Sequence, residues 1–295
     1  MKNKKQLYGV LFAAPVIIGL LVLFVWPMIQ SLQIAFSDVT PSSGGLKLEW
    51  AGFKNFNAVF FVDNEYIPKL NWVLPQMLMN VPIVVMFSFI AANIINQKFH
   101  GQKVARVIFF LPIVLASTAM IAMDTSDMMQ QAMTNPDFKD IATSQSFLQS
   151  FELSGMMMSL GFPPEIVQFL STAVNQVYQV ITLSGVQMLI ILAALQSVSP
   201  SLYEAAHVEG ATGWEKFWLV TFPLISPTLL LCVIYSIIDS FTAWDNGIVT
   251  LINNKYAATQ YAMSSAMAWV YFVIIGAILG IVIFAGSKLV FNYDK

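Results

Sequence analysis

The sequence is poor in the residues that a soluble or metal-binding protein needs. Only 10% of its 295 residues are charged, whereas an ordinary soluble domain has about 25%. One cysteine and two histidines are too few for a disulfide framework or a Cys/His zinc site. A net charge of −2 provides no basic surface for nucleic acid, and so little charge also excludes intrinsic disorder. We therefore expect no metal site and no nucleic-acid partner.

Apolar residues are in excess, at 57% of the chain, and the mean hydropathy is +0.71. The charged residues fall in clusters separated by long uncharged runs, such as the run between Lys5 and Asp38. A bilayer-spanning helix needs about 20 consecutive apolar residues, and continuous rather than alternating runs favour helices over a β-barrel. The sequence thus predicts an all-α integral membrane protein with one transmembrane domain over residues 1–295. Its six predicted spans are about 7–36, 74–95, 104–123, 175–196, 217–238 and 267–290.

The distribution of lysine and arginine predicts the orientation of these spans. Basic residues are enriched in cytoplasmic segments, and a cytoplasmic N-terminus places nine of them inside and five outside. Both termini are then cytoplasmic, and the external segments are 37–73, 124–172 and 239–266. The first run continues to Phe36, well beyond the 7–15 residues of a signal-peptide core, so we interpret it as a retained span. The second external segment is acidic and rich in methionine, and we expect it to form a folded cap.

The predicted cytoplasmic loop at 197–216 differs from the other cytoplasmic segments because its acidic residues outnumber its basic ones, three to one. Ser201 and Glu204 have the spacing of a capping box, so we expect a short helix to begin there. Gly210 stands where that helix should end, because glycine readily adopts the left-handed conformation of a helix C-terminus. Two alanines after Glu204 leave one side without bulk. From the residues alone the loop is either a capped linker or a docking helix for a cytoplasmic partner.

This loop resembles the EAA loop of permease subunits in binding-protein-dependent ABC importers. The usual form of that loop is E-A-A-x-x-D-G-A, followed downstream by L-P. Here the matching stretch is Glu204-Ala-Ala-His-Val-Glu-Gly-Ala211 with Phe222-Pro223 after it, so Glu209 and Phe222 replace the usual Asp and Leu. Further stretches resemble the carbohydrate branch of this family, and in particular the first permease subunit of maltose-type importers. They are Phe24-Val-Trp-Pro27, Trp50-Ala-Gly-Phe-Lys-Asn-Phe56, Arg106-Val-Ile-Phe-Phe-Leu-Pro112 and the run from Met188 to Tyr203.

The resemblance implies a type I ABC importer permease fold in a bacterial cytoplasmic membrane. Such a chain is not an enzyme and binds no cofactor itself. It works with a second permease subunit, with two ATPase subunits that bind ATP and Mg²⁺, and with an extracytoplasmic solute-binding protein that delivers a sugar or oligosaccharide. The sequence contains no G-x-x-x-x-G-K-[ST] phosphate loop, which agrees with ATP hydrolysis by another chain. The implied ATPase-coupling residues are Glu204, Ala205, Ala206, Glu209 and Gly210.

Polar residues within the fourth and fifth predicted spans are candidates for the substrate path, because polar groups that face lipid are costly. The fourth span has three of them at positions i, i+4 and i+7, which is one helix face, and the fifth has two at i and i+4 with a tryptophan beyond. The same residue types form hydrogen bonds between helices, at about 1 kcal/mol each, so packing stays the alternative for each. The candidates are Asn175, Gln179, Thr182, Tyr235, Asp239 and Trp244.

Three other functions stay open on the sequence alone. The same importer class could carry a solute other than a sugar. A self-sufficient channel or secondary transporter would favour ionisable groups in mid-span or an internal repeat, and we find neither. A membrane-embedded enzyme needs a nucleophile beside a base, whereas Cys232 stands alone in its span and both histidines fall in predicted cytoplasmic loops.

Overall fold

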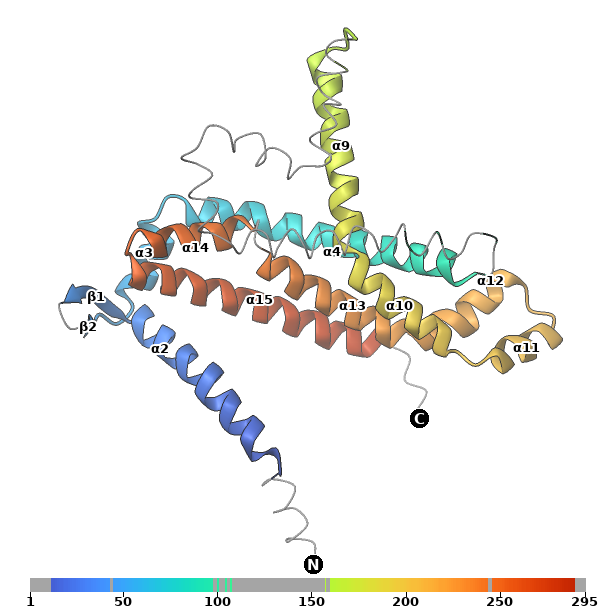
Figure 1. Cartoon of the computed structure of the whole chain (residues 1–295), viewed down its shortest axis with the longest axis horizontal. Coiled ribbons are helices and arrows are strands. Elements are labelled where there is room, and N and C mark those ends of the chain that lie inside the picture. The colour runs from blue at the N-terminus through green and yellow to red at the C-terminus, as the bar shows by residue number, and fades with distance from the viewer. Residues whose placement is uncertain are drawn as a thin grey trace, which may run out of the picture. The chain divides into compact units, whose positions relative to one another are not determined.

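The computed structural model describes residues 12–42, 45–97, 160–243 and 246–289, together with positions 100, 104, 107 and 157 (Figure 1). Apart from Val104 and Val107, the predicted third span at 104–123 therefore lies outside the described residues. The same holds for residues 124–156 of the predicted external segment.

The described part of the chain is mostly helical. Four of its helices are long and apolar enough to cross a membrane, and a bent pair of helices adds a fifth candidate. The four are Phe12–Ala35, Tyr66–Asn96, Gly213–Ala257 and Tyr261–Lys288, and the bent pair is Pro164–Leu183 with Gly185–Ser197. Several extend beyond the predicted spans, because the apolar runs continue as helix past the charged residues that were expected to end them.

The chain divides into two compact units, and the division falls inside three long helices. One unit is built from the described residues of Met1–Leu78 and Ile237–Phe284, and the other from those of Met79–Ser236 and Ala285–Lys295. The helices that contain the division are α4 (Tyr66–Asn96), α13 (Phe222–Thr242) and α15 (Tyr261–Leu289). We describe each unit in turn.

In the first unit the opening span ends in a β-hairpin that the sequence did not predict. The span passes through the π-helical turn η1 (Leu21–Val25) into α2 (Trp26–Ala35), and β1 (Ser37–Ser42) follows at once (Figure 1). Strand β1 pairs antiparallel with β2 (Gly45–Trp50), with Ser37 opposite Trp50. The short helix α3 (Lys54–Phe61) comes next.

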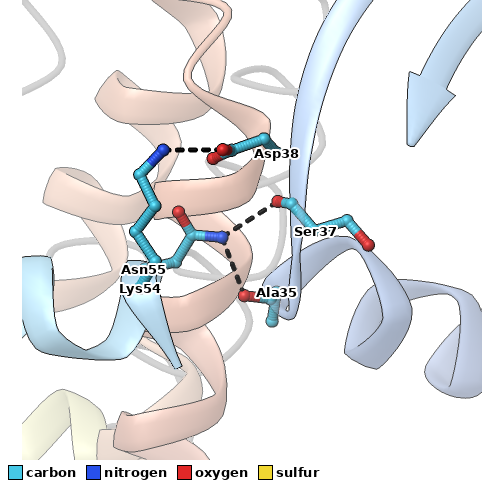
Figure 2. Close-up of polar contacts among 5 residues, drawn as sticks. All are labelled: Ala35, Ser37, Asp38, Lys54 and Asn55. Atoms are coloured by element: carbon cyan, nitrogen blue, oxygen red, sulfur yellow. Dashed lines mark hydrogen bonds and ion pairs between the residues drawn. The ribbon is translucent and has the colours of Figure 1, made fainter. Parts of the chain in front are cut away.

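A buried asparagine holds the hairpin and α3 to the end of the first span. The amide of Asn55 donates one hydrogen bond to the carbonyl of Ala35 at 3.0 Å and another to that of Ser37 at 2.9 Å (Figure 2). The last carbonyls of a helix have no partner within the helix, so Asn55 supplies one from a distant segment. Beside it, Lys54 pairs with Asp38 at 2.6 Å.

The beginning of α4 is fixed by Asp63. One carboxylate oxygen of Asp63 accepts hydrogen bonds from the backbone N–H groups of Glu65 at 3.0 Å and Tyr66 at 2.8 Å. The other oxygen pairs with the Lys255 ammonium at 2.7 Å, where the Asp63 side chain is only 5% exposed. Lys255 belongs to α14 (Gly247–Ala257). The pair therefore joins segments that are 192 residues apart in the sequence.

Asn246 plays a comparable part at the beginning of α14. Its side-chain oxygen accepts hydrogen bonds from the N–H groups of Ile248 and Val249. Its side-chain nitrogen donates to the Ser240 carbonyl at 2.9 Å and to the Tyr271 hydroxyl at 2.8 Å. One buried amide thus caps a helix and also links it to α13 and α15.

The second unit contains the apolar core and a bent helix. The sequence predicts one continuous span over 175–196, whereas the structure has two helices, α9 (Pro164–Leu183) and α10 (Gly185–Ser197), that meet at 50°. The bend lies at Ser184 and Gly185, a residue pair typical of helix kinks. The Ser184 hydroxyl donates to the Ile181 carbonyl, and the Ser184 carbonyl accepts from the Ser88 hydroxyl at 3.1 Å.

Below the bend, α10 packs into a cluster of buried residues from α4, α10 and α13. Small residues on α4 allow close contact, and branched or long side chains on α10 fill the space between the helices. The cluster contains Val85, Ala91, Ala92, Ile95, Met188, Ile191, Leu192, Leu195, Ile225 and Cys232.

Replacing Asn55 by alanine should destabilise the first unit. The substitution leaves the buried carbonyls of Ala35 and Ser37 without these hydrogen bonds, which should lower the free energy of unfolding by about 1–3 kcal/mol. Thermal unfolding in detergent measures the change. The matched control is Asn57→Ala on the same helix, where the side chain is exposed. Equal effects of the two substitutions would contradict the role assigned to Asn55.

The Asp63–Lys255 pair should make stability depend on pH. Burial alone would raise the pKa of Asp63, but hydrogen bonds from Lys255, Tyr66 and Glu65 outweigh it and hold that pKa below its ordinary value. Because the folded-state pKa is the lower one, the stabilisation is complete above the unfolded-state pKa of about 3.9 and is lost as pH falls through the folded-state value.

We therefore expect Asp63→Asn to melt well below the unsubstituted chain at pH 7, with the difference closing below about pH 4. Melting temperatures across this pH range provide the measurement. The control is Glu49→Gln, which removes the exposed pair with Lys47 and should change little at any pH, because exposed pairs are worth about 0–1 kcal/mol. A pH-independent difference for Asp63→Asn would count against the assignment.

Candidate functional site

The acidic loop contains a helix, α11 (Pro200–Val208), that begins two residues earlier than the predicted capping box requires. Ser199 is the N-cap residue and Pro200 takes the first helical position, where its fixed φ suits a helix start. Ser201 lies within the first turn, and its hydroxyl is 2.8 Å from that of Ser199. The predicted Ser201–Glu204 capping box is therefore wrong. The Glu204 carboxylate forms no hydrogen bond or ion pair with any described residue.

The end of α11 is as predicted from Gly210. This glycine has φ +78°, and its N–H donates to the carbonyl of His207 at 3.0 Å. The next N–H, of Ala211, donates to the carbonyl of Ala206 at 2.9 Å. These two bonds form the Schellman motif, which satisfies the last carbonyls of a helix when a left-handed residue follows it.

A capping box does occur in the loop, at the beginning of α12 (Gly213–Lys216). The Thr212 N–H donates to the Glu215 carboxylate at 2.7 Å, and the Glu215 N–H donates to the Thr212 hydroxyl at 3.3 Å. The T-x-x-E pattern at 212–215 carries this signal in the sequence, and the sequence analysis missed it. The loop thus has two short helices, and the second leads through the π-helical turn η3 (Phe217–Thr221) into α13.

Two side-chain contacts tie α11 to the segment that leads into α13. The Tyr203 hydroxyl lies 3.0 Å from that of Thr221, which is buried. The Lys216 ammonium lies 3.3 Å from Nδ1 of His207. Beside them, aromatic rings pack in sequence from Trp214 through to α13, with ring centroids 5.0–6.4 Å apart. The rings are Trp214, Phe217, Trp218 and Phe222. Movement of α11 would therefore be transmitted to α13.

Helix α11 is an exposed element. Figure 1 shows it beyond the end of α10, and none of its residues is buried. Ala205 and Glu204 are exposed, Ala206 is half-buried, and Val208 is 88% exposed. The helix therefore presents a carboxylate, a small-residue surface and an apolar side chain together. This combination suits close contact with another protein that supplies a basic group.

The candidates for the substrate path lie on two helices. Asn175, Gln179 and Thr182 belong to α9, where Gln179 is exposed and the Thr182 hydroxyl is buried without a hydrogen-bond partner among the described residues. Tyr235 and Asp239 belong to α13 and are half-buried. The side chain of Asn175 and the whole of Trp244 lie outside what the structure describes.

Gln187 is a polar residue of the second unit that the list of candidates omitted. It is 1% exposed, and its side-chain nitrogen donates to the Ser236 hydroxyl at 2.9 Å. Its side-chain oxygen has no hydrogen-bond partner within the described part of the chain. Gln187 thus links α10 to α13 through a buried polar contact. Among the same residues, no group of three His, Cys, Asp or Glu side chains could hold a metal ion.

The chain is similar in sequence to permeases of ABC transporters, although no family model matches it. It is 26% identical to the probable ABC transporter permease protein YesP of Bacillus subtilis, over 99% of this chain and 94% of that protein. It is 24% identical to the multiple sugar-binding transport system permease protein MsmF of Streptococcus mutans, over 94% of each. It is 26% identical to the sn-glycerol-3-phosphate transport system permease protein UgpA of Agrobacterium fabrum, over 78% of this chain and 74% of that protein.

The fold is similar to that of a chain in a solved importer. The crystal structure is of a bacterial ABC transporter involved in the import of the acidic polysaccharide alginate, and the match has a TM-score of 0.64 at 19% identity. It covers 97% of this chain and 96% of that one. A second structure of the alginate transporter, in complex with a periplasmic protein that holds an alginate pentasaccharide, matches equally well, with a TM-score of 0.64. The resemblance first seen in the EAA-like loop thus extends over nearly the whole chain, in sequence and in fold.

Replacing Gly210 by alanine should loosen the end of α11. No atom of the described residues lies within 4 Å of a Cβ placed there, so the cost is conformational, about 1–2 kcal/mol for a left-handed L-residue. Amide hydrogen exchange in α11 should become about 5- to 30-fold faster, with little change in the melting temperature. Gly213→Ala is the control, because that glycine is equally open but has no positive φ. Unchanged exchange in Gly210→Ala would contradict the Schellman assignment.

Proposed function

We propose that this chain is the transmembrane permease subunit of an ABC importer for a sugar or oligosaccharide. The observation that carries the proposal is the exposed helix α11, whose Glu204 carboxylate has no partner among the described residues, in a chain with the fold of an importer permease. The curated relatives that name a sugar support the substrate class. In this proposal the chain itself hydrolyses nothing, and ATP and Mg²⁺ bind to separate ATPase subunits.

The proposed topology has six spans with both termini in the cytoplasm of a bacterium. The excess of lysine and arginine on the proposed inner side supports this orientation, and it places α11 in the cytoplasm. The partners are a second permease subunit, two ATPase subunits and an extracytoplasmic solute-binding protein. The alginate importer whose structure includes a periplasmic protein supports the last of these.

Coupling to the ATPases is proposed to act through α11. The Glu204 carboxylate pairs with a basic residue of the ATPase, and the small side chains of Ala205 and Ala206 allow the two proteins to approach closely. The Tyr203–Thr221 contact and the capped helix α12 then make α11 and the beginning of α13 move together. Closure of the ATPase dimer would tilt α13 and change the side from which the path is open, as in rigid-body gating around a midplane site.

The substrate path is proposed to run along the polar residues of α9 and α13. Asn175, Gln179 and Thr182 recur on one face of α9, and α13 contributes Tyr235 and Asp239, with Trp244 beyond. Aromatic rings with amide and carboxylate acceptors suit a neutral polyhydroxylated ligand, because each hydroxyl can donate to an acceptor while the rings cover its apolar face.

A non-sugar solute is the second candidate, and one relative favours it. The protein UgpA is named as a permease for sn-glycerol-3-phosphate and is 26% identical to this chain over 78% of its length, whereas YesP has the same identity over 99%. The same coupling through α11 would apply, and only the path would carry a different molecule.

The test uses a tagged chain in its native host, purified in mild detergent and assayed for solute uptake. We expect a second permease and an ATPase to copurify. Glu204→Ala removes a charged hydrogen bond worth about 1.5–3 kcal/mol, so association with the ATPase should weaken roughly 10- to 100-fold and uptake should fall. The control is Glu165→Ala, an exposed glutamate in the first turn of α9, which should leave both unchanged.

Normal ATPase association and uptake in Glu204→Ala would remove the coupling role. Uptake that persists without any ATPase subunit would show that the chain is a secondary transporter and not part of an ABC importer. A ligand screen on the copurifying binding protein distinguishes a sugar from another solute.

A further inference from the structure

Four large aromatic side chains on β2 and α3 are exposed, although they belong to a well-packed segment of the first unit. Trp50 is 77% exposed, Phe53 69%, Phe60 44% and Phe61 85%. We call these four residues the aromatic face. The stretch Trp50-Ala-Gly-Phe-Lys-Asn-Phe56 carries two of them, and the coupling and path proposed above use neither.

The aromatic face lies opposite the buried side of α3. Asn55 and Val59 are four residues apart and are both buried, so they define the inner side of the helix. Phe53 and Phe60 are seven residues apart, and the helical period of 3.6 places them together on the outer side, with Phe61 next to them. One side of α3 therefore packs within the unit, and the opposite side presents aromatic rings.

The aromatic face is held in position and cannot fold back into the unit. The ring of Phe36, the residue that ends the first span, stacks on Trp50 at 5.5 Å and contacts Phe53 edge-on at 5.3 Å. The two hydrogen bonds from Asn55 fix the same segment to the carbonyls of Ala35 and Ser37 (Figure 2). Trp50 and Phe53 are thus supported from one side by rigid contacts while their other sides stay open.

The segment is also tethered at both ends to candidate spans. The first, Phe12–Ala35, ends immediately before β1, and the next, Tyr66–Asn96, begins shortly after α3. A connection between two consecutive spans stays at the membrane face where the first one ends. The aromatic face therefore adjoins the bilayer surface, where Trp is enriched and where interfacial helices insert Trp and Phe side chains.

We propose that β2 and α3 lie in the membrane–water interface, with the aromatic face inserted among the lipid headgroups and upper acyl chains. The occupant of this face is lipid, and the inference rests on the assignment of the two flanking helices as spans. Asn57 lies between the aromatic rings on the same side, and its amide can hydrogen-bond to headgroup oxygens. The segment would anchor the end of the first span at a fixed depth, as interfacial amphipathic helices do.

A spin label at position 61 tests this depth. Phe61→Cys is made in a Cys232→Ala background, which removes the one native cysteine, and the full chain is reconstituted into vesicles of phosphatidylcholine and phosphatidylglycerol. Collision rates with O₂, which enters lipid, and with a water-soluble nickel chelate are measured by power saturation. Lys47→Cys, at an exposed position of β2, is the aqueous control. Val273→Cys, 63% exposed on α15, is the lipid control, and Phe60→Cys is a second reporter.

We expect the ratio of O₂ to nickel collisions at positions 61 and 60 to exceed that at position 47 several-fold and to approach that at 273. A ratio at 61 equal to that at 47 would place the aromatic face in water and overturn the proposal. Low collision rates with both reagents would show that a protein covers it, which overturns the proposal as well. A water-like label at 273 would instead refute the assignment of α15 as a span, which rests on the same length and apolar composition as that of the two flanking helices, and would overturn the proposal with it.

Discussion

Backbone polar groups find no water in a bilayer, so each must be bonded within the protein. A regular helix meets this requirement along its length but not at its ends or at a break. The described polar contacts of this chain concentrate at such places. Asn55 supplies a donor to the end of α2, Asp63 accepts from the start of α4, and Ser88 donates to the carbonyl at the bend between α9 and α10. These few side chains determine where the apolar helices stop and turn.

The two units use polar groups for different purposes. In the first unit buried polar side chains join separate elements, as Asp63 does with Lys255 and Asn246 does with Ser240 and Tyr271, which suits a part that must keep its shape. In the second unit no residue of α11 is buried, and Tyr203 ties this helix to the η3 turn that leads into α13. A docking element needs this arrangement, because it must be accessible to a partner and still transmit displacement.

The sequence predicts the long helices well, because uncharged apolar runs have few alternatives to a helix in lipid. Gly210 likewise specifies its local conformation, since few other residues tolerate a positive φ. The hairpin was missed because Pro41 lies within β1, and proline argues against a strand. Ser199 and Ser201 are both residue types that cap helices well. Pro200 favours the first helical position, and this makes Ser199 the N-cap.

In the candidate site, the sequence predicts the short helix α11 and its exposed position. It does not predict the contacts that attach α11 to the segment leading into α13. The T-x-x-E pattern that caps α12 is visible in the sequence, but the Tyr203–Thr221 contact joins residues on separate elements. Asn55 reads in the sequence as an ordinary residue of an external segment, and no pattern connects Asp63 with Lys255. Trp244 lies outside the described residues, so its predicted place in the path stays a prediction.

The pairing of Asp63 with Lys255 has a consequence for how the chain is made. The two residues are 192 positions apart, and a ribosome adds about 5–20 residues per second. Asp63 is therefore synthesised about 10–40 s before its counter-charge emerges. During this interval the early helices must reside in the membrane, or at the translocon, with an uncompensated carboxylate. Completion of this unit is thus a late event in biogenesis.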